Sequence, residues 1–239
     1  MSRHQRLLLV VHHDPSDLGQ VRTVLEKLGQ SFDICCPMTG DELPAPQVYD
    51  RAIVFGGSYS AMDDHLAEIR SEIKWLERAF ACDTALVGIC LGAQLMARAL
   101  GAPVLRPVDG ECEVGFVTIT PTAAGEGIFP PDARLFFQWH EDGFEVPDDA
   151  VLLARGQAYP NQAFAYRDHS FAFQFHPESS APQVREWMTV SKSFLDRQGA
   201  DEPEKQFTDF ARHGPVQSAW LEEFLTGWLG KAARESESN

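Results

Sequence analysis

The sequence predicts an α/β protein with a doubly wound, mostly parallel sheet that carries helices on both faces. In the first half of the 239 residues, short apolar runs alternate three times with longer runs of helical periodicity. Adjacent parallel strands need a long crossover, usually a helix, and each of these cycles supplies one. The second half changes to short apolar runs separated by turn residues. These runs predict further strands, some of them antiparallel, that complete or flank the sheet.

The elements follow from the spacing of the apolar residues. The run LLLVV at 7–11 is apolar at every position, which is typical of a strand covered on both faces. Gly29 offers a left-handed stop to the helix that follows. We expect strands at 7–11, 52–55 and 85–89, with helices at 18–28, 66–80 and 91–100 after them. Further strands are expected at 113–120, 134–139, 150–156, 162–167 and 170–176.

Residues 1–190 are expected to form the main domain, and residues 191–239 a C-terminal helical extension packed on it. In the extension, Trp220, Phe224 and Trp228 recur at helical spacing and form one apolar stripe. Burial of this stripe against the domain is the simpler interpretation, and a docking surface for another protein is the alternative. Helices are expected at 183–195 and 219–229, a solvated link at 199–205 and a disordered tail at 233–239.

Composition and charge argue against several classes of function. Thirty-five acidic residues against 20 basic ones give a net charge of -15, so the average surface repels nucleic acid and anionic membranes. The apolar run near the N-terminus is too short for a signal-peptide core or a membrane span. The five cysteines form no C-x-x-C pair and suggest neither a disulfide framework nor a zinc ribbon. We therefore expect a cytoplasmic protein that binds neither nucleic acid nor membrane.

Cys90 lies between two glycines in VGICLGAQ (87–94), where a predicted strand meets a predicted helix. The free N–H groups and partial positive charge of a helix N-terminus favour the thiolate form of a cysteine. Gly88 and Gly92 suit the unusual backbone angles and close packing of a sharp strand-to-helix turn. Cys90 is therefore a candidate nucleophile, and the alternative is a small core residue beside a tight turn.

A candidate base lies in SFAFQFHPE (170–178). Three phenylalanines alternate along one face of the predicted strand, which leaves Gln174 and His176 on the opposite face. Pro177 ends the strand, so the imidazole stands at its end. The Glu178 carboxylate can hold one ring nitrogen of His176 and leave the other for a thiol. A purely structural histidine is the alternative.

Cys90 and His176 both follow predicted strands, and loops after the carboxyl ends of strands gather in one crevice of an open α/β sheet. GICLGAQLMARALG around Cys90, FQFHPE around His176 and IVFGGSYSAMDD at 53–64 resemble, in order and spacing, the class I (triad) glutamine amidotransferases. The resemblance covers residues 5–190. FQWHEDGFEVP and LLARGQAYPNQAFAYRD look most like stand-alone members similar to the amidotransferase domain of GMP synthase.

The resemblance implies a flavodoxin-like fold and a catalytic triad of Cys90, His176 and Glu178. Cys90 would attack the side-chain amide of glutamine, and His176, oriented by Glu178, would protonate the departing ammonia and then activate water. The resulting glutamyl thioester would be hydrolysed to glutamate. The family's oxyanion hole and substrate site correspond to the backbone N–H groups of Gly57 and Leu91 and to the residues Gln94, Trp139 and His140.

Two residues depart from the usual pattern of the family. Ser58 stands where a proline is common after the paired glycines, and it could alter the rigidity of the oxyanion loop. Glu141 stands where a glycine is common after Trp-His. It is expected to place an additional negative charge beside the substrate site, which argues against free glutamine as the natural substrate.

Neither a metal nor a cofactor is expected. The polar clusters His12-His13-Asp14 and His140-Glu141-Asp142 follow strands, but they lack typical zinc spacing and are expected to be hydrogen-bonded loops. No G-x-G-x-x-G follows the first strand, and no G-x-x-x-x-G-K-[ST] occurs in the sequence.

Three functions fit these observations, with glutamine or a γ-glutamyl compound as the substrate. The first is a glutaminase that passes ammonia to a synthetase on another chain. The second is a partner-independent hydrolase or transferase of γ-glutamyl peptides or γ-glutamyl amines. The third is a non-catalytic binding or regulatory relative, which the intact Cys-His-Glu set disfavours.

Overall fold

The computed structural model describes residues 6–14, 17–132 and 134–235. Its strands are β1 (Leu7–Val10), β2 (Phe32–Cys35), β3 (Arg51–Val54), β4 (Ala85–Ile89), β5 (Val104–Leu105), β6 (Glu113–Pro121), β7 (Arg134–His140), β8 (Gly143–Phe144), β9 (Ala150–Arg155), β10 (Ala163–Tyr166) and β11 (Ser170–Phe173). Its helices are α1 (Gly19–Lys27), α2 (Ala67–Ala81), α3 (Leu91–Ala99), α4 (Ala181–Val190), α5 (Lys192–Leu195) and α6 (Pro203–Glu235). Short 3₁₀ turns are η1 (Pro37–Thr39), η2 (Pro46–Val48) and η3 (Ala123–Gly125).

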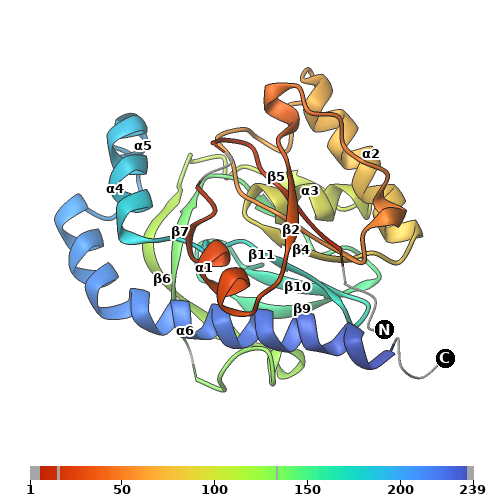
Figure 1. The fold of residues 1–239 in the computed structure, drawn as a ribbon. Coiled ribbons are helices and arrows are strands. Elements are labelled where there is room, and N and C mark those ends of the chain that lie inside the picture. The colour runs from red at the N-terminus through yellow and green to blue at the C-terminus, as the bar shows by residue number, and fades with distance from the viewer. Residues whose placement is uncertain (1–5, 15–16, 133, 236–239) are drawn as a thin grey trace.

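A nine-stranded sheet in the order β2-β1-β3-β4-β11-β10-β9-β6-β7 forms the centre of the molecule (Figure 1). The neighbours from β2 to β11 pair in parallel, and those from β11 to β7 pair antiparallel. This confirms the predicted doubly wound sheet with added antiparallel strands. The parallel pairing of β4 with β11 brings the ends that precede Cys90 and His176 side by side.

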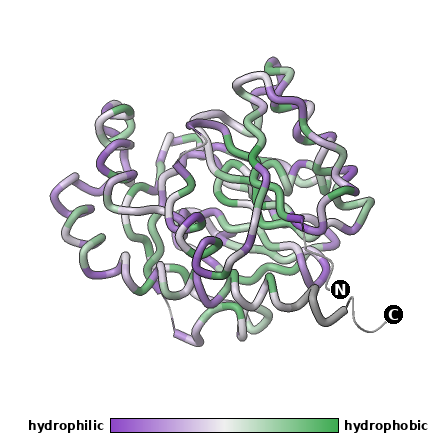
Figure 2. Tube along the Cα trace, viewed as in Figure 1, coloured by the Kyte–Doolittle hydropathy of each residue, from purple (hydrophilic) through white to green (hydrophobic). Residues whose placement is uncertain are grey.

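Helices cover both faces of the sheet, as the sequence predicts. Leu7 and Leu9 of β1 belong to one buried cluster with residues of α1 and α6, whereas Leu8 and Val10 belong to another with residues of α2 and α3. Figure 1 shows α6 running beneath the sheet beside α1, with α2 and α3 on the opposite side. Figure 2 shows the hydrophobic residues concentrated along the strands between these layers.

The sequence analysis missed the edge strand β2. It carries polar Asp33, which pairs with Arg6 at 3.0 Å, and Ile34 is 36% exposed. An edge strand needs no continuous apolar run, because one side of it is not covered by a neighbouring strand. The two-residue strands β5 and β8, which pair only with each other, were missed for their shortness.

The helical extension differs from its prediction in several places. The single helix predicted at 183–195 is divided at Ser191 into α4 and α5. Helix α6 begins at Pro203 and continues through Pro215, so it is much longer than the predicted 219–229. Residues 199–201 are not a solvated link, because the N–H of Asp201 donates to the carbonyl oxygen of Val114 at 2.9 Å and Ala200 bridges to the same residue. The extension is therefore paired with β6 before α6 starts.

The apolar stripe of α6 is buried against the sheet. Trp220, Phe224 and Trp228 are 7%, 8% and 3% exposed, and Trp220 stacks on Phe129 at a centroid distance of 5.3 Å. The division into residues 1–190 and 191–239 stays a prediction. Of the tail 233–239 expected to be disordered, residues 233–235 are instead the last residues of α6, and residues 236–239 lie outside the described residues. In the described part of the chain, no helix is both long and apolar enough to cross a bilayer.

Candidate active site

Cys90 occupies a sharp turn between β4 and α3. Its backbone angles are φ 49° and ψ -106°, a left-handed conformation that costs energy for a residue with a side chain. A Cβ atom on Gly92 would lie 2.1 Å from the carbonyl oxygen of Val54, and one on Gly88 would lie 2.6 Å from Sδ of Met96. The flanking glycines are therefore required by close packing, and the predicted strand-to-helix turn is confirmed.

His176 lies just beyond β11, where its backbone N–H donates to the carbonyl oxygen of Phe137 at 2.7 Å. Its Nδ1 lies 2.8 Å from Oε1 of Glu178, and the two side chains are only 7% and 5% exposed. Among the described residues, Nε2 of His176 is buried and has no hydrogen-bond partner of normal geometry. One ring nitrogen is therefore held by a carboxylate, and the other is left for Cys90.

Cys90 and His176 meet at Gly56. A Cβ atom on Gly56 would lie 2.7 Å from Cε1 of His176 and 3.4 Å from Cβ of Cys90. Burial lowers the pKa of His176, but the charge of Glu178 and the neighbouring Cys90 outweigh it and raise that pKa to about 10. At neutral pH the imidazole is consequently protonated and stands ready to donate a proton.

The two residues expected to supply the oxyanion hole lie together. A Cβ atom on Gly57 would lie 3.2 Å from Cδ2 of Leu91. Leu91 is the first residue of α3, and the first N–H groups of a helix have no partner within it. The arrangement places backbone donors from the loop after β3 and from the start of α3 next to Cys90.

The three residues expected to bind substrate, Gln94, Trp139 and His140, differ in how much of each side chain is engaged within the protein. Nε2 of Gln94 donates to the carbonyl oxygen of Asp142 at 2.9 Å, and the carbonyl oxygen of Trp139 lies 3.9 Å from Sγ of Cys90. His140 is buried, with Nε2 at 3.1 Å from Oε2 of Glu113 and Nδ1 at 3.1 Å from the carbonyl oxygen of Asp142. His140 thus links the 139–142 segment to Glu113 of β6 through hydrogen bonds. Both of its ring nitrogens are engaged, so neither is free for a ligand.

Glu141 does not add an uncompensated charge, which corrects the expectation from the sequence. One of its carboxylate oxygens lies 3.1 Å from Nη2 of Arg106, and the other pairs with Arg197. Arg106 also binds Asp142 through two nitrogens, at 2.7 and 3.2 Å. This network of acidic and basic groups neutralises the segment, so the argument against free glutamine loses its basis.

Two glutamines at the site were not assigned from the sequence. Nε2 of Gln174 lies 3.9 Å from Sγ of Cys90, and the alternation that puts Gln174 on the face of His176 could have suggested this. Gln217 of α6 donates to the carbonyl oxygen of His176 at 3.1 Å and accepts from the N–H of Phe137 at 2.8 Å. No local pattern signals Gln217, because its partners are far away in the sequence.

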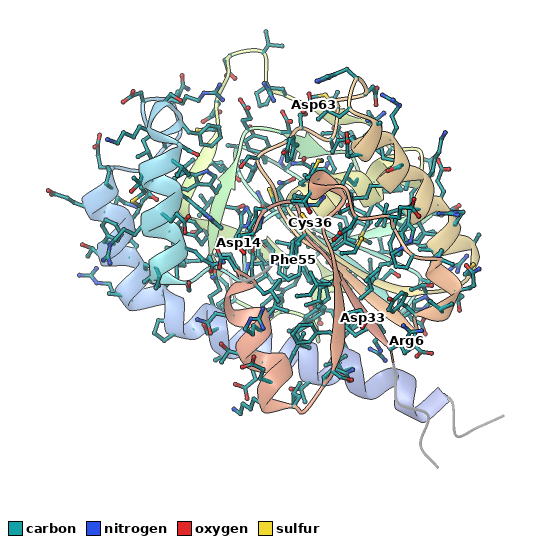
Figure 3. All side chains as sticks on the ribbon, turned by 45° about the horizontal axis from the view of Figure 1, so that its top comes forward. Arg6, Asp14, Asp33, Cys36, Phe55 and Asp63 are labelled. Carbon is teal, nitrogen blue, oxygen red and sulfur yellow. The ribbon has the colours of Figure 1, made fainter. Side chains whose placement is uncertain are left out.

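The polar cluster at 12–14 is hydrogen-bonded loop, as expected. His12 bonds to Glu72 and to the backbone of Gly56, and His13 to the carbonyl oxygen of Asp17. In Figure 3, Asp14, Cys36 and Phe55 lie at the ends of the strands they follow, away from Arg6 and Asp33. Within the ranges that the structure describes, no group of three or more His, Cys, Asp or Glu side chains could hold a metal ion.

Comparison with known proteins finds similar proteins that include glutamine amidotransferases and a gamma-glutamyl peptidase. The chain is 30% identical over 206 residues to the glutamine amidotransferase-like protein YfeJ of Salmonella typhimurium, covering 81% of this chain and 84% of that protein. It is 30% identical over 139 residues to gamma-glutamyl peptidase 4 of Arabidopsis thaliana, covering 54% of each. It is 33% identical over 129 residues to GMP synthase of Streptococcus pneumoniae, covering 53% of this chain but only 24% of the synthase.

A solved structure and a family model agree with these relatives. The crystal structure of a glutamine amidotransferase from Thermotoga maritima superposes with a TM-score of 0.84 at 28% identity, over 95% of this chain and 98% of the other. The family model for glutamine amidotransferase class-I matches residues 21–190. The resemblance seen in the sequence is confirmed, and the chain belongs to the class I glutamine amidotransferase family.

Proposed function

We propose that the protein is a cysteine hydrolase that cleaves the γ-amide of glutamine through a glutamyl thioester and releases ammonia. The observation that carries this proposal is the meeting of Cys90 and His176 at Gly56, with Glu178 bound to the far side of the imidazole. A nucleophile, a base and a group that orients the base are the parts that covalent amide hydrolysis needs. Gln94 and Trp139 stay proposed substrate contacts.

The proposed reaction has two halves that use the same residues. Cys90 gives its thiol proton to Nε2 of His176, and Sγ attacks the γ-carbonyl carbon as the thiolate, while the carbonyl oxygen takes up negative charge facing the N–H groups of Gly57 and Leu91. His176, protonated because its pKa is raised, gives its proton to the amide nitrogen as the C–N bond breaks. Neutral His176 then takes a proton from water, which attacks the thioester. Glutamine and water become glutamate and ammonia, and Cys90 is regenerated.

The nitrogen compound that leaves separates two candidate functions, because glutamine releases ammonia whereas a γ-glutamyl peptide or amine releases an amino acid, a peptide or an amine. The glutaminase supplies ammonia to a synthetase on another chain, in line with the relation to GMP synthase. The second candidate, a partner-independent hydrolase of γ-glutamyl peptides or amines, is favoured by the relation to gamma-glutamyl peptidase 4. We also infer a reducing, cytoplasmic setting, because all five cysteines are free.

A diazo-ketone analogue of glutamine is expected to label Cys90 alone. Burial raises the pKa of Cys35 and of Cys112 to about 11, so both thiols stay protonated at pH 8. Intact-mass spectrometry should show one adduct, and peptide mapping should place it on Cys90. Glutamine should protect this site, whereas iodoacetamide should also modify exposed Cys82. Adducts found mainly on Cys35 or Cys112 would contradict the proposed site.

Substrate and partner dependence can be tested with the purified chain. Release of glutamate is measured from glutamine, glutathione and a panel of γ-glutamyl amines. A glutaminase that waits for a synthetase should be nearly silent alone with every compound. Rapid turnover of several γ-glutamyl peptides, lost in Cys90→Ala, would favour the second candidate. Equal turnover by wild type and Cys90→Ala would overturn both.

A further inference from the structure

Besides His176–Glu178 and His140–Glu113, a third buried histidine–carboxylate pair lies beside the loop that carries Gly56 and Gly57. His12, two residues after β1, and Glu72 of α2 both have side chains with 0% exposure. Nε2 of His12 lies 2.9 and 3.1 Å from the two carboxylate oxygens of Glu72. The proposed mechanism uses neither residue, and an ionisable pair buried so completely beside a reactive cysteine requires an explanation.

The other nitrogen of His12 holds the backbone at the reactive centre. Nδ1 lies 3.2 Å from the carbonyl oxygen of Gly56, the residue at which Cys90 and His176 meet. A Cβ atom on Gly57 would lie 2.6 Å from Cβ of His12, so the loop is seated directly on this side chain. His12 therefore contacts the peptide group between Gly56 and Gly57 directly, through its carbonyl oxygen.

The chemistry of the contacts fixes where the protons are. A carbonyl oxygen can only accept, so Nδ1 of His12 must carry a hydrogen. A carboxylate also only accepts, so a hydrogen must lie between Nε2 and Glu72 as well. The pair thus binds one proton more than a neutral imidazole with its ordinary single N–H. In agreement, the pKa of His12 is raised, since the charge of Glu72 and these hydrogen bonds outweigh the lowering by burial.

Because the peptide group is planar, a hydrogen bond to the carbonyl oxygen of Gly56 also fixes the direction of the N–H of Gly57. In a trans peptide the carbonyl oxygen and the following N–H point in opposite directions. When Nδ1–H of His12 holds the carbonyl oxygen of Gly56, the N–H of Gly57 is therefore turned away from His12. Leu91, the other expected donor, also lies beside Gly57, with Cδ2 at 3.2 Å from a Cβ on Gly57. Because glycine permits many backbone angles, the peptide group between Gly56 and Gly57 can rotate, and a hydrogen bond from outside the loop is needed to fix its orientation.

We propose that His12, held by Glu72, is a positioning residue that fixes the Gly56–Gly57 peptide and keeps the N–H of Gly57 aimed at the oxyanion. The proposal rests on the proposed amide hydrolysis. The pair, from the loop after β1 and from α2, would supply the rigidity of the oxyanion hole. Ser58 stands where a proline is common and does not supply this rigidity.

Three variants test this role. His12→Leu removes the hydrogen bond to Gly56, and His12→Asn keeps an amide donor near the position of Nδ1. The double variant His12→Leu/Glu72→Met also removes the carboxylate that would otherwise be buried without a partner, and such apolar replacement of a buried pair commonly preserves stability. All are made with Cys82→Ser, and thermal unfolding confirms that each is folded.

The readouts are kcat and KM for the best substrate of the panel, and the rate at which iodoacetamide alkylates Cys90. Removal of one oxyanion donor lowers kcat by about 10²–10³-fold, and we expect this loss in His12→Leu and in the double variant, with KM nearly unchanged. Alkylation displaces iodide without forming an oxyanion, so its rate should stay within about threefold of wild type. His12→Asn should recover most of the lost kcat.

The outcomes distinguish this inference from the function on which it rests. A wild-type chain that turns over no compound of the panel and takes no diazo-ketone label on Cys90 overturns the hydrolase itself. An active wild type with a fully active, folded double variant overturns only the positioning role. A parallel loss of turnover and alkylation, without recovery in His12→Asn, also overturns it, because His12 would then support the whole site and not the oxyanion hole.

Discussion

Cys90→Ala is expected to lower the rate of glutamate release by on the order of 10⁴-fold or more, since removal of a nucleophile disables a triad as a unit. The remaining site has no group that can form the thioester. The fold should persist, because the change removes only the sulfur atom of one side chain and leaves the backbone of the turn unaltered. The rate is measured by coupled detection of glutamate, and the free energy of unfolding by urea denaturation.

Two control variants sharpen the Cys90 experiment. Cys82→Ala changes an exposed thiol and should leave turnover within about twofold of wild type. Cys90→Gly should be as inactive as Cys90→Ala but no less stable, because glycine adopts the φ of 49° without the strain that alanine retains. A Cys90→Ala enzyme that keeps its turnover, or a Cys90→Gly protein that unfolds far more readily than Cys90→Ala, would refute this account of the turn.

Glu178→Gln is expected to reduce kcat/KM by on the order of 10³–10⁴-fold, as the loss of the orienting carboxylate does in other triads. The amide can still accept from Nδ1 of His176, but it carries no charge. Loss of this charge lowers the pKa of His176 relative to wild type, so the imidazole holds the proton that the departing ammonia needs less firmly. Glu186→Gln, which changes an exposed carboxylate on α4, is the matched control.

The same variant predicts a change in the pH dependence of stability. The pKa of His176 is raised from 6.5 to about 10 in the folded protein, so the native state holds this proton more tightly than the unfolded chain. The resulting stabilisation is fully present below pH 6.5 and is lost as the pH rises toward 10. Urea denaturation at pH 6, 8 and 10 should show a steeper fall for wild type than for Glu178→Gln. Parallel curves would contradict the assigned ion pair.

The reactive centre could be predicted from the sequence because its signals are local. A Cβ atom on either glycine that flanks Cys90 would lie only 2.1 or 2.6 Å from a neighbouring atom. Such close packing restricts these two positions to glycine. The strand predicted to run to His176 ends at Phe173, but Phe171, Phe173 and Phe175 still share one buried cluster, so the alternation that the sequence shows continues past the strand toward His176. Both patterns follow from backbone geometry, which a short stretch of sequence carries in full.

The parts that escaped prediction depend on contacts between distant segments. His12 and Glu72 are 60 residues apart, and nothing near either one reveals the other. The charge of Glu141 was misjudged because its partners, Arg106 and Arg197, come from separate elements. The start of α6 was missed because helix propensity is weak beside tertiary packing, which here buries Gln206 and holds Phe207 and Phe210 against Phe116 and Phe137.

Gln217 has a consequence for how the protein is made. Its side chain donates a hydrogen bond to the carbonyl oxygen of His176, which lies 41 residues earlier in the chain. A polypeptide folds progressively as it leaves the ribosome, starting from its N-terminal parts. The segment with the imidazole therefore emerges before the helix that holds it, so the site around His176 is completed only after Gln217 of α6 has left the ribosome.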